Sequence, residues 1–331
     1  MNLLSSISFS QNLIADLTNV SPQTVLRVIK DMNVHNINTE SLKIKKYSYI
    51  DTKVISSNII KKGNIEKKIH VFYNLKGGTG KTSICYQLGF HLSIIGFNVL
   101  FIDCDPQGHL STILNFPEDG SYFTLYDVLI SGIPLKDAII NILPGLDAIP
   151  SNLSLSRVEV PLTQKARREE QLKELLTKVS PNYDFVFIDT NPYISSLNLN
   201  ALVAADHVNF VCETAPFSLY GLRVLMEETK KFFNDMRIPL SCNIISNRYE
   251  GKTATAQEVI GYLRTNYKEY MMQSVVRKCE DFNIATKEKL PVASFSKRKS
   301  IAVEDIKDLM HEFLSISRNN NHKNVAAATF E

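Results

Sequence analysis

The chain has 331 residues, of which 44% are hydrophobic and 21% are charged, a balance typical of a folded globular protein. Its five cysteines are scattered and form no C-x-x-C pair, which argues against a zinc site or a disulfide framework and favours a reducing, cytoplasmic location. The net charge is only +3, but residues 1–68 and 252–299 each carry ten Lys/Arg against five Asp/Glu. These two basic regions favour a polyanionic partner such as DNA.

Residues 10–31 are typical of a helix-turn-helix. Asn19 tolerates the left-handed backbone of a turn, and Ser21 followed by Pro22 is an N-cap and first-turn pair that starts a second helix. Val25 and Val28 are expected to face inward. The outward side chains, suited to phosphates and base edges, are Gln23, Thr24, Arg27 and Lys30. The alternative is a plain helical hairpin that packs on the main domain.

Residues 32–50 show no clear periodicity, and 61–64 are typical of a linker, so the first region is expected to span 1–64. Beyond it, apolar runs alternate with helical patterns, which predicts an α/β fold with a mostly parallel twisted sheet covered by helices on both faces. The predicted strands are 69–73, 98–102, 183–188, 208–212 and 240–246. The predicted helices are 84–95, 165–179, 219–233 and 303–313. This domain is expected to span 65–316, and 317–331 is expected to be a loose tail.

Residues 76–83 read Lys-Gly-Gly-Thr-Gly-Lys-Thr-Ser, a phosphate-binding loop between an apolar strand and a helix. In such a loop the lysine, here Lys81, reaches the β- and γ-phosphates, and the following hydroxyl, Thr82, holds Mg²⁺. Lys76 is an additional charge that a simple phosphate loop does not need. The predicted nucleotide-binding residues of the loop are Gly77, Gly78, Thr79, Gly80, Lys81, Thr82 and Ser83.

Three carboxylates stand at the ends of predicted strands, where ligands bind in parallel sheets. Asp189 closes the apolar run 185–188, the Walker B arrangement that orders a metal's water shell. Asp103 and Asp105 share one face of an extended segment, so they are expected to serve the metal and the attacking water, respectively. Residues 106–108 are expected to form a turn that senses the γ-phosphate. Capping of a helix is the alternative role for Asp105.

Segments 76–83, 103–108 and 189–192 together resemble the deviant Walker ATPases of the ParA family, within the SIMIBI (MinD–ParA) superfamily. The resemblance runs from about 69 to 313, and 149–152 and 246–248 are similar to further family segments. The N-terminal region resembles the longer ParA subclass, which also represses its own operon. Three positions depart from the family pattern: Leu75 replaces a Gln, Asn191 replaces a Pro, and Val276 stands where a Pro often precedes Arg277.

The resemblance implies a weak ATP hydrolase that uses ATP and Mg²⁺ and segregates a plasmid or chromosome. It implies that Lys76 crosses an ATP-sandwiched homodimer, that Asp105 positions the attacking water beside Lys81, and that Asn247 and Arg248 lie on the adenine side. It also implies that dimers bind DNA non-specifically, that a ParB-like partner triggers hydrolysis, and that the protein is cytoplasmic and nucleoid-associated. The candidate non-specific DNA contacts are Arg264, Lys268, Arg277, Lys297 and Arg298.

Two other functions share these motifs. A MinD-like spatial regulator needs a membrane-seeking amphipathic segment at its C-terminus, whereas residues 319–331 are polar and then small, so no membrane partner is expected. A transcriptional repressor that senses nucleotide would need the N-terminal region but little turnover. The complete set of carboxylates favours hydrolysis over that second alternative.

Overall fold

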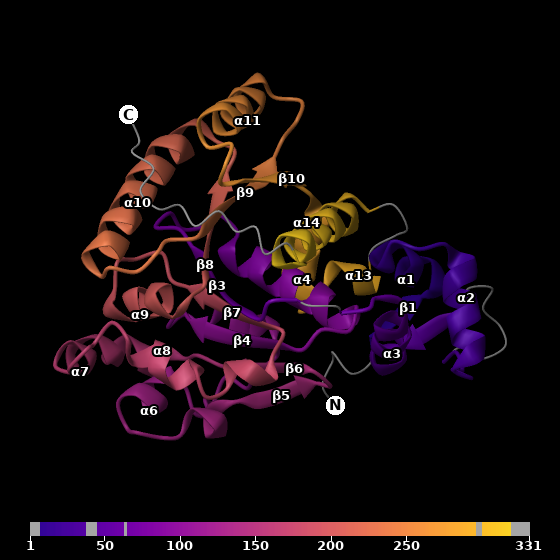
Figure 1. The fold of residues 1–331 in the computed structure, drawn as a ribbon, viewed down its shortest axis with the longest axis horizontal. Helices are drawn as coiled ribbons and strands as arrows, with labels where there is room; N and C mark the ends of the chain where they lie inside the picture. Colours follow the sequence, from indigo (N-terminus) through magenta and orange to yellow (C-terminus); the bar gives the residue numbers. More distant parts are fainter. Residues whose placement is uncertain (1–6, 38–44, 63–64, 296–299, 319–331) are drawn as a thin grey trace.

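The computed structural model describes residues 7–37, 45–62, 65–295 and 300–318, and its centre is an eight-stranded sheet (Figure 1). The strand order is β10-β9-β8-β3-β7-β4-β6-β5, and every neighbouring pair is parallel except β5 with β6. The strands are β3 (Lys68–Tyr73), β4 (Val99–Cys104), β5 (Ile140–Leu143), β6 (Leu146–Ile149), β7 (Phe185–Thr190), β8 (His207–Glu213), β9 (Cys242–Tyr249) and β10 (Met271–Arg277). The predicted α/β fold with a mostly parallel sheet is confirmed.

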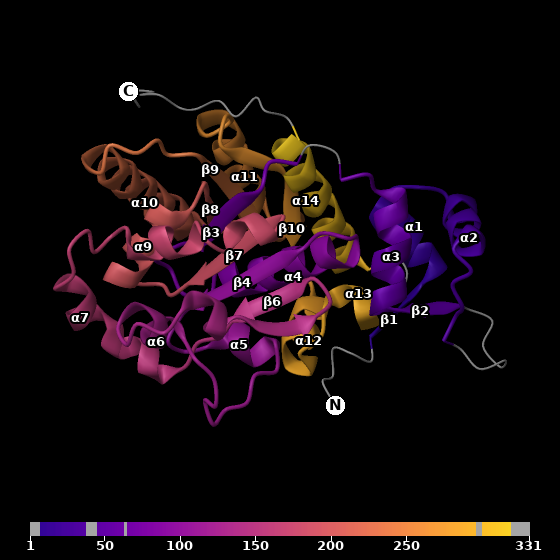
Figure 2. The same cartoon turned by 60° about the horizontal axis from the view of Figure 1, so that its bottom comes forward.

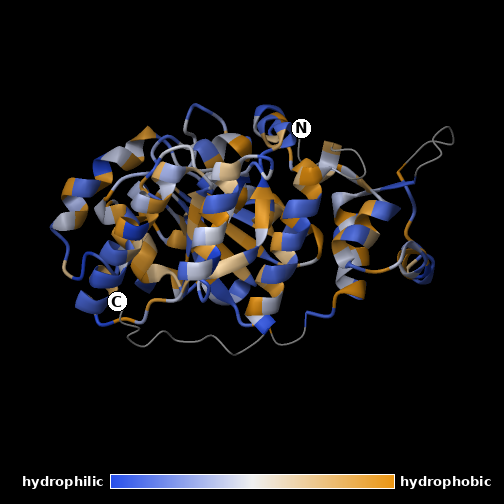
Figure 3. Cartoon of the chain, turned by 90° about the horizontal axis from the view of Figure 1, so that it is seen from above, coloured by the Kyte–Doolittle hydropathy of each residue, from blue (hydrophilic) through white to orange (hydrophobic). Residues whose placement is uncertain are grey.

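Alternating side chains of the central strands enter two separate hydrophobic clusters, one on each face of the sheet. Phe187 of β7 belongs to the cluster beneath α4 (Lys81–Ile94) and α14 (Ile301–Arg318), whereas its neighbours on β7 belong to the cluster beneath α9 (Ser196–Ala204) and α10 (Pro216–Asp235). Figure 3 shows apolar strands enclosed by helices with polar outer faces. The near-continuous apolar strands are therefore explained by burial on both sides.

The remaining helices of this domain lie in the connections between strands, except for the last two listed, which lie between β10 and α14. They are α5 (His109–Ile113), α6 (Leu125–Leu129), η2 (Leu135–Ala138), η3 (Leu153–Val158), α7 (Glu159–Thr163), α8 (Gln171–Leu176), η4 (Ser180–Asn182), α11 (Ala254–Asn266), α12 (Glu280–Glu288) and α13 (Val292–Phe295). Within the described ranges, no helix is long and apolar enough to cross a membrane.

The N-terminal region contains the two predicted helices and a third that the sequence analysis missed. In α1 (Gln11–Thr18) and α2 (Pro22–Asp31) the turn forms as expected: Asn19 has φ 54°, and the Ser21 hydroxyl accepts the Thr24 N–H. Strands β1 (Ser8–Ser10) and β2 (Lys46–Ser48) pair antiparallel, and α3 (Tyr49–Ile59) follows directly. Serine caps begin all three of these helices, which explains where each starts.

The N-terminal helices pack on the main domain rather than standing apart from it. In Figures 1 and 2 they lie at one end of the molecule, beside α13 and α4. Side chains such as Phe9, Ile14 and Leu17 are fully buried and belong to the same hydrophobic cluster as α4 and α14. Lys53 of α3 donates hydrogen bonds to the Ser93 and Phe97 carbonyls at the end of α4, and burial lowers its pKa to about 8. The region is thus bound to the helix that follows the phosphate loop.

All four predicted helices have different bounds in the structure, and two of them differ by more than three residues at one end. The helix expected over 165–179 exists only as α8, because Arg167 takes a left-handed backbone with φ 49° and interrupts the pattern. The helix expected over 303–313 runs on through Arg318, and Ser317 is buried at its end. The rest of the predicted tail lies outside the described residues.

Candidate nucleotide-binding site

The phosphate loop joins β3 to α4, as the sequence predicts, so the N-terminus of α4 and its free N–H groups face the loop. Gly78 and Gly80 have φ 76° and 91°, a backbone region that side chains with a Cβ rarely adopt. A Cβ at Gly80 would lie 2.2 Å from Asn247 Nδ2, and that amide donates to the Thr79 carbonyl at 2.7 Å. Two independent constraints therefore require glycine at position 80.

Thr82 and Asp189 meet at the base of this loop, although 107 residues separate them. The Thr82 hydroxyl donates to Asp189 Oδ2 at 2.7 Å, and among the described residues Asp189 Oδ1 has no hydrogen-bond partner. Asp189 is fully buried, and burial, together with the nearby Asp103, raises its pKa. Burial also lowers the pKa of Lys81, whereas the negative charges of Asp189 and Asp105 act in the opposite direction and raise it.

These groups fit a magnesium ion that is held mainly by nucleotide and water. In the part of the chain that the structure describes, no three His, Cys, Asp or Glu side chains gather as a preformed metal site. Mg²⁺ usually takes only one or two protein oxygens and completes its shell with phosphates and water. The Thr82 hydroxyl and the unpartnered Asp189 Oδ1 are oxygens of this kind. A cation there would also offset the cost of the buried carboxylate.

Asp103 and Asp189 occupy paired positions on β4 and β7, so the structure brings the two predicted metal carboxylates together. The oxygens of Asp103 are already engaged: Oδ1 accepts the Asp105 N–H, and Oδ2 accepts the N–H and hydroxyl of Ser111. Burial raises the Asp103 pKa to about 6. This geometry favours a supporting position for Asp103 and leaves direct metal contact to Thr82 and Asp189.

Asp105 begins the segment that leads from β4 to α5. Its Oδ1 accepts the Gln107 N–H at 2.9 Å, and Gly108, with φ 61°, lets the chain turn into α5. The Ser151 hydroxyl donates to the Asp105 carbonyl at 2.7 Å, and the Ser151 N–H donates to Ser111. Asp105 does not cap α5, whose N-cap is Gly108, so the alternative structural role is not observed.

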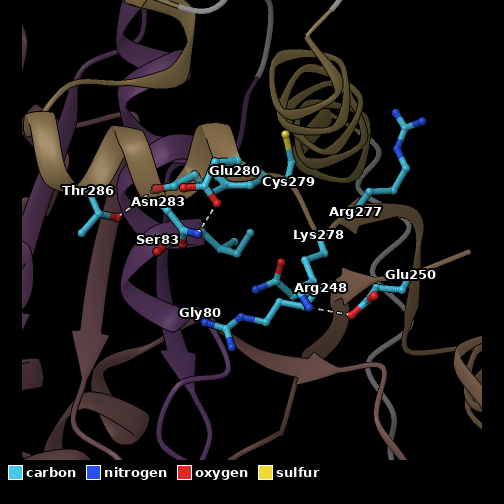
Figure 4. A pocket seen from close by; sticks show the side chains of 13 residues that line it. Gly80, Ser83, Arg248, Glu250, Arg277, Lys278, Cys279, Glu280, Asn283 and Thr286 are labelled. Atoms are coloured by element: carbon cyan, nitrogen blue, oxygen red, sulfur yellow. Dashed lines mark hydrogen bonds and ion pairs between the residues drawn. The ribbon is translucent and has the colours of Figure 1, made fainter.

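A cavity of about 480 Å³ adjoins the loop (Figure 4), and the lining does not include Asp103, Asp105 or Asp189. Asn247 and Arg248 line it, as expected for the adenine side, and so do Gly80 and Ser83 of the loop. The opposite wall comes from α12, where Asn283 donates to Glu280 at 2.8 Å. The predicted site did not include α12. The mixture of polar and apolar side chains that line this cavity suits a nucleobase.

Lys76 does not pair with a carboxylate of the magnesium site. Its Nζ lies 2.7 Å from Glu213 Oε2 and 3.3 Å from the Ser218 hydroxyl, and its side chain is 48% exposed. Arg248 approaches the other oxygen of Glu213 at 3.8 Å. Glu213, at the end of β8, thus holds the additional lysine at the rim of the site. Glu213 was not among the predicted site residues, because 137 positions separate it from Lys76 in the sequence.

The predicted DNA-contact residues divide into three groups. Gln23, Arg27 and Lys30 are exposed on α2, and Thr24 is half-buried and hydrogen-bonded to Ser21. Arg264 and Lys268 are exposed near the end of α11, whereas Arg277 forms ion pairs with Glu304 and Asp305. Lys297 and Arg298 lie outside the described residues. The pairing of Arg277 with α14 gives that residue a structural contact in addition to its predicted one.

Comparison with known proteins identifies the family of this chain. A family model described as an AAA domain matches residues 67–242, more than half of the chain. The cell division protein PomZ of Myxococcus xanthus is 38% identical over 67% of this chain and 70% of its own length. The chromosome-partitioning ATPase Soj of Treponema pallidum is 32% identical over 69% of this chain and 90% of its own length. The chromosome partitioning protein ParA of Caulobacter vibrioides is 35% identical over 61% of this chain and 78% of its own length. The chain belongs to the ParA family of partitioning ATPases.

Solved structures share the fold of this ParA-family chain at lower identity. McdA of Cyanothece superposes with a TM-score of 0.68 at 21% identity, covering 76% of this chain and 99% of McdA. A plasmid partition protein of Borrelia burgdorferi, bound to AMPPNP, superposes with a TM-score of 0.64 at 24% identity, and the match covers 76% of this chain and 100% of that chain. Cobyrinic acid a,c-diamide synthase of Mycobacterium smegmatis, with an ATP analogue and magnesium, superposes with a TM-score of 0.67 at 22% identity. The match covers 78% of this chain and 98% of the synthase. At these identities, the neighbours show that the fold is shared.

Proposed function

We propose that this chain is a DNA-partitioning ATPase that binds Mg-ATP, dimerises over the nucleotide and hydrolyses ATP to ADP and phosphate. The observation that carries the proposal is the convergence of Thr82, Asp189 and Asp105 on the phosphate loop. Lys81 and the loop N–H groups would bind the phosphates, and Thr82 and Asp189 would hold Mg²⁺, which neutralises charge on the transferring phosphoryl group. Asp105 would then orient the attacking water.

Exposed apolar side chains around the nucleotide-binding site support the proposal that a partner chain binds over this site. Tyr193 and Ile194 follow the Asp189 strand and are 68% and 71% exposed, and Phe217, next to the Lys76 contact Ser218, is 90% exposed. Large apolar residues that gather at a functional site mark an interaction surface. The position of Lys76 at the rim, with a half-exposed side chain, supports a contact with a nucleotide bound by a second copy of the chain.

We expect Lys76→Ala to bind ATP with near-normal affinity but to lose ATP-dependent dimerisation, because the substitution removes a charge from the rim and leaves the loop intact. Light scattering coupled to gel filtration, with a non-hydrolysable ATP analogue and Mg²⁺, measures the dimer. A fluorescent ATP analogue measures binding to the monomer. Lys231→Ala on α10, an exposed lysine away from the loop, is the matched control. A fully dimeric Lys76→Ala protein would reject the proposed arrangement.

The proposed DNA role rests on the two basic regions and on the exposed face of α2. We infer that ATP-bound dimers bind DNA without sequence preference, that α2 adds recognition of an operator, and that a ParB-like partner stimulates turnover in a cytoplasmic, nucleoid-associated setting. Phosphate release should therefore be weak for the protein alone and should rise when DNA and the cognate partner are added.

The operator role is best tested with point variants, because Phe9, Ile14 and Leu17 are buried in the main core and truncation would expose it. We expect Arg27→Ala/Lys30→Ala to weaken operator footprinting at least tenfold, since two groups facing the groove are lost, while ATP-dependent binding to random DNA persists. Lys136→Ala/Lys231→Ala, an equal loss of exposed charge, is the control. Equal loss of both binding modes in the α2 variant would contradict a separate operator surface.

A further inference from the structure

His109 lies beside the carboxylate that is proposed to orient the attacking water. It is the first residue of α5, directly after the Gly108 turn, and its Nδ1 is 3.7 Å from Asp105 Oδ2. The imidazole is 66% exposed, whereas the Asp105 side chain is only 9% exposed. The contact therefore joins a solvent-accessible titratable group to a buried catalytic one.

The two oxygens of Asp105 have different surroundings. Oδ1 accepts the Gln107 N–H at 2.9 Å, which fixes the orientation of the carboxylate within its turn. Over the ranges that the structure describes, His109 is the one ion-pair partner of Oδ2. Oδ2 is consequently the oxygen left to accept a hydrogen bond from a water molecule, and it is the same oxygen that His109 faces.

The other charged groups near this pair are already engaged or lie on the phosphate side. His109 and Asp105 line a hollow of about 510 Å³, with Tyr193 and with Glu159 of α7. Glu159 accepts the N–H groups of Ser196 and Leu197 at the start of α9. On the loop side of Asp105 stand Lys81 of α4, Asp103 of β4 and Asp189 of β7.

We propose that His109 is a pH-dependent positioning residue, which slows ATP hydrolysis when it is protonated by taking Asp105 Oδ2 away from the attacking water. Histidine is the side chain whose ordinary change of charge falls between pH 5 and 8. The neutral imidazole leaves Oδ2 available to water, whereas the imidazolium attracts the carboxylate through a charge-assisted hydrogen bond. Hydrolysis should therefore decline as pH falls. This inference rests on the proposed function.

The test compares ATP hydrolysis by the full-length chain between pH 6 and 8 at constant ionic strength, with Mg-ATP and random-sequence DNA. The wild-type rate should fall at least about threefold between pH 8 and pH 6, a range in which histidine ordinarily gains its charge. The rate of His109→Gln should fall clearly less than that of the wild type over the same range, because glutamine cannot become charged. His109→Lys, which stays cationic, should be slow at both ends. His35→Gln, at an exposed histidine of the N-terminal region, should follow the wild type.

Binding of a fluorescent ATP analogue at each pH separates nucleotide affinity from turnover. Asp103, whose pKa burial raises to about 6, titrates in the same range, so a decline shared equally by wild type and His109→Gln would overturn the role of His109. A His109→Lys protein as fast as wild type at pH 8 would overturn it as well. A wild-type chain that binds ATP but releases no phosphate at any pH would instead reject the proposed function itself.

Discussion

Replacing Asp105 with Ala should reduce single-turnover ATP hydrolysis by about a hundredfold or more, because the attacking water loses the carboxylate that orients it. ATP binding should stay close to wild type, since the loop, Lys81 and Thr82 are unchanged. The turn should also persist: the Ser151 hydroxyl donates to the Asp105 carbonyl, which the substitution retains. Rapid-quench measurement of phosphate from pre-bound ATP, with DNA and the cognate partner present, follows the chemical step directly.

The controls separate chemistry from folding. Asp105→Asn keeps the side-chain oxygen that accepts the Gln107 N–H, so a comparable loss of rate in this variant would assign the effect to the charge. Asp235→Ala, at the exposed end of α10, should hydrolyse ATP at the wild-type rate. An Asp105→Ala protein that binds ATP and turns over normally would remove Asp105 from the mechanism and leave Lys81 with Mg²⁺ as the source of catalysis.

The parts of the site that could be predicted from the sequence are those encoded by neighbouring residues. The loop 76–83 carries its own glycines, and Asp103 and Asp189 each directly follow an apolar run that must be a buried strand. Parallel pairing then brings the strand ends together, so the meeting of Thr82 with Asp189 follows from the topology. Local sequence and a general rule on parallel sheets were sufficient for this core of the site.

The rest depends on contacts between distant segments that no local pattern indicates. The partner of Lys76 is Glu213, and the turn after Asp105 is held by Ser151, a residue of the segment 149–152 that the sequence analysis used only as a family landmark. The α12 wall of the base cavity was missed for the same reason. At the N-terminus, α3 has no strong helical periodicity, because several of its polar residues, such as Thr52 and Ser56, are buried.

Asp189→Asn should abolish magnesium-dependent hydrolysis and at the same time stabilise the nucleotide-free protein by about 1–3 kcal/mol at pH 8. The carboxylate is fully buried, and among the described residues its Oδ1 has no partner, so the folded chain bears the cost of a desolvated charge. Asparagine removes the charge and still accepts the Thr82 hydroxyl. Urea unfolding in EDTA measures the gain, and Asp235→Asn is the exposed control.

The direction of the pH dependence follows from the pKa of Asp189, which burial raises above its ordinary value of 3.8. Between the ordinary and the raised value the folded chain holds a proton that the unfolded chain has released, so wild-type stability falls as pH rises through this range. The advantage of Asp189→Asn should therefore be absent below about pH 4 and grow toward pH 8. Mg²⁺ with ATP should raise the stability of the wild type, because the unpartnered oxygen that destabilises the free protein is the one that would hold the metal. The variant lacks this carboxylate, so Mg²⁺ with ATP should stabilise it no more than ATP alone does. A variant that is less stable than wild type at pH 8 would show that Asp189 contributes to folding without its metal.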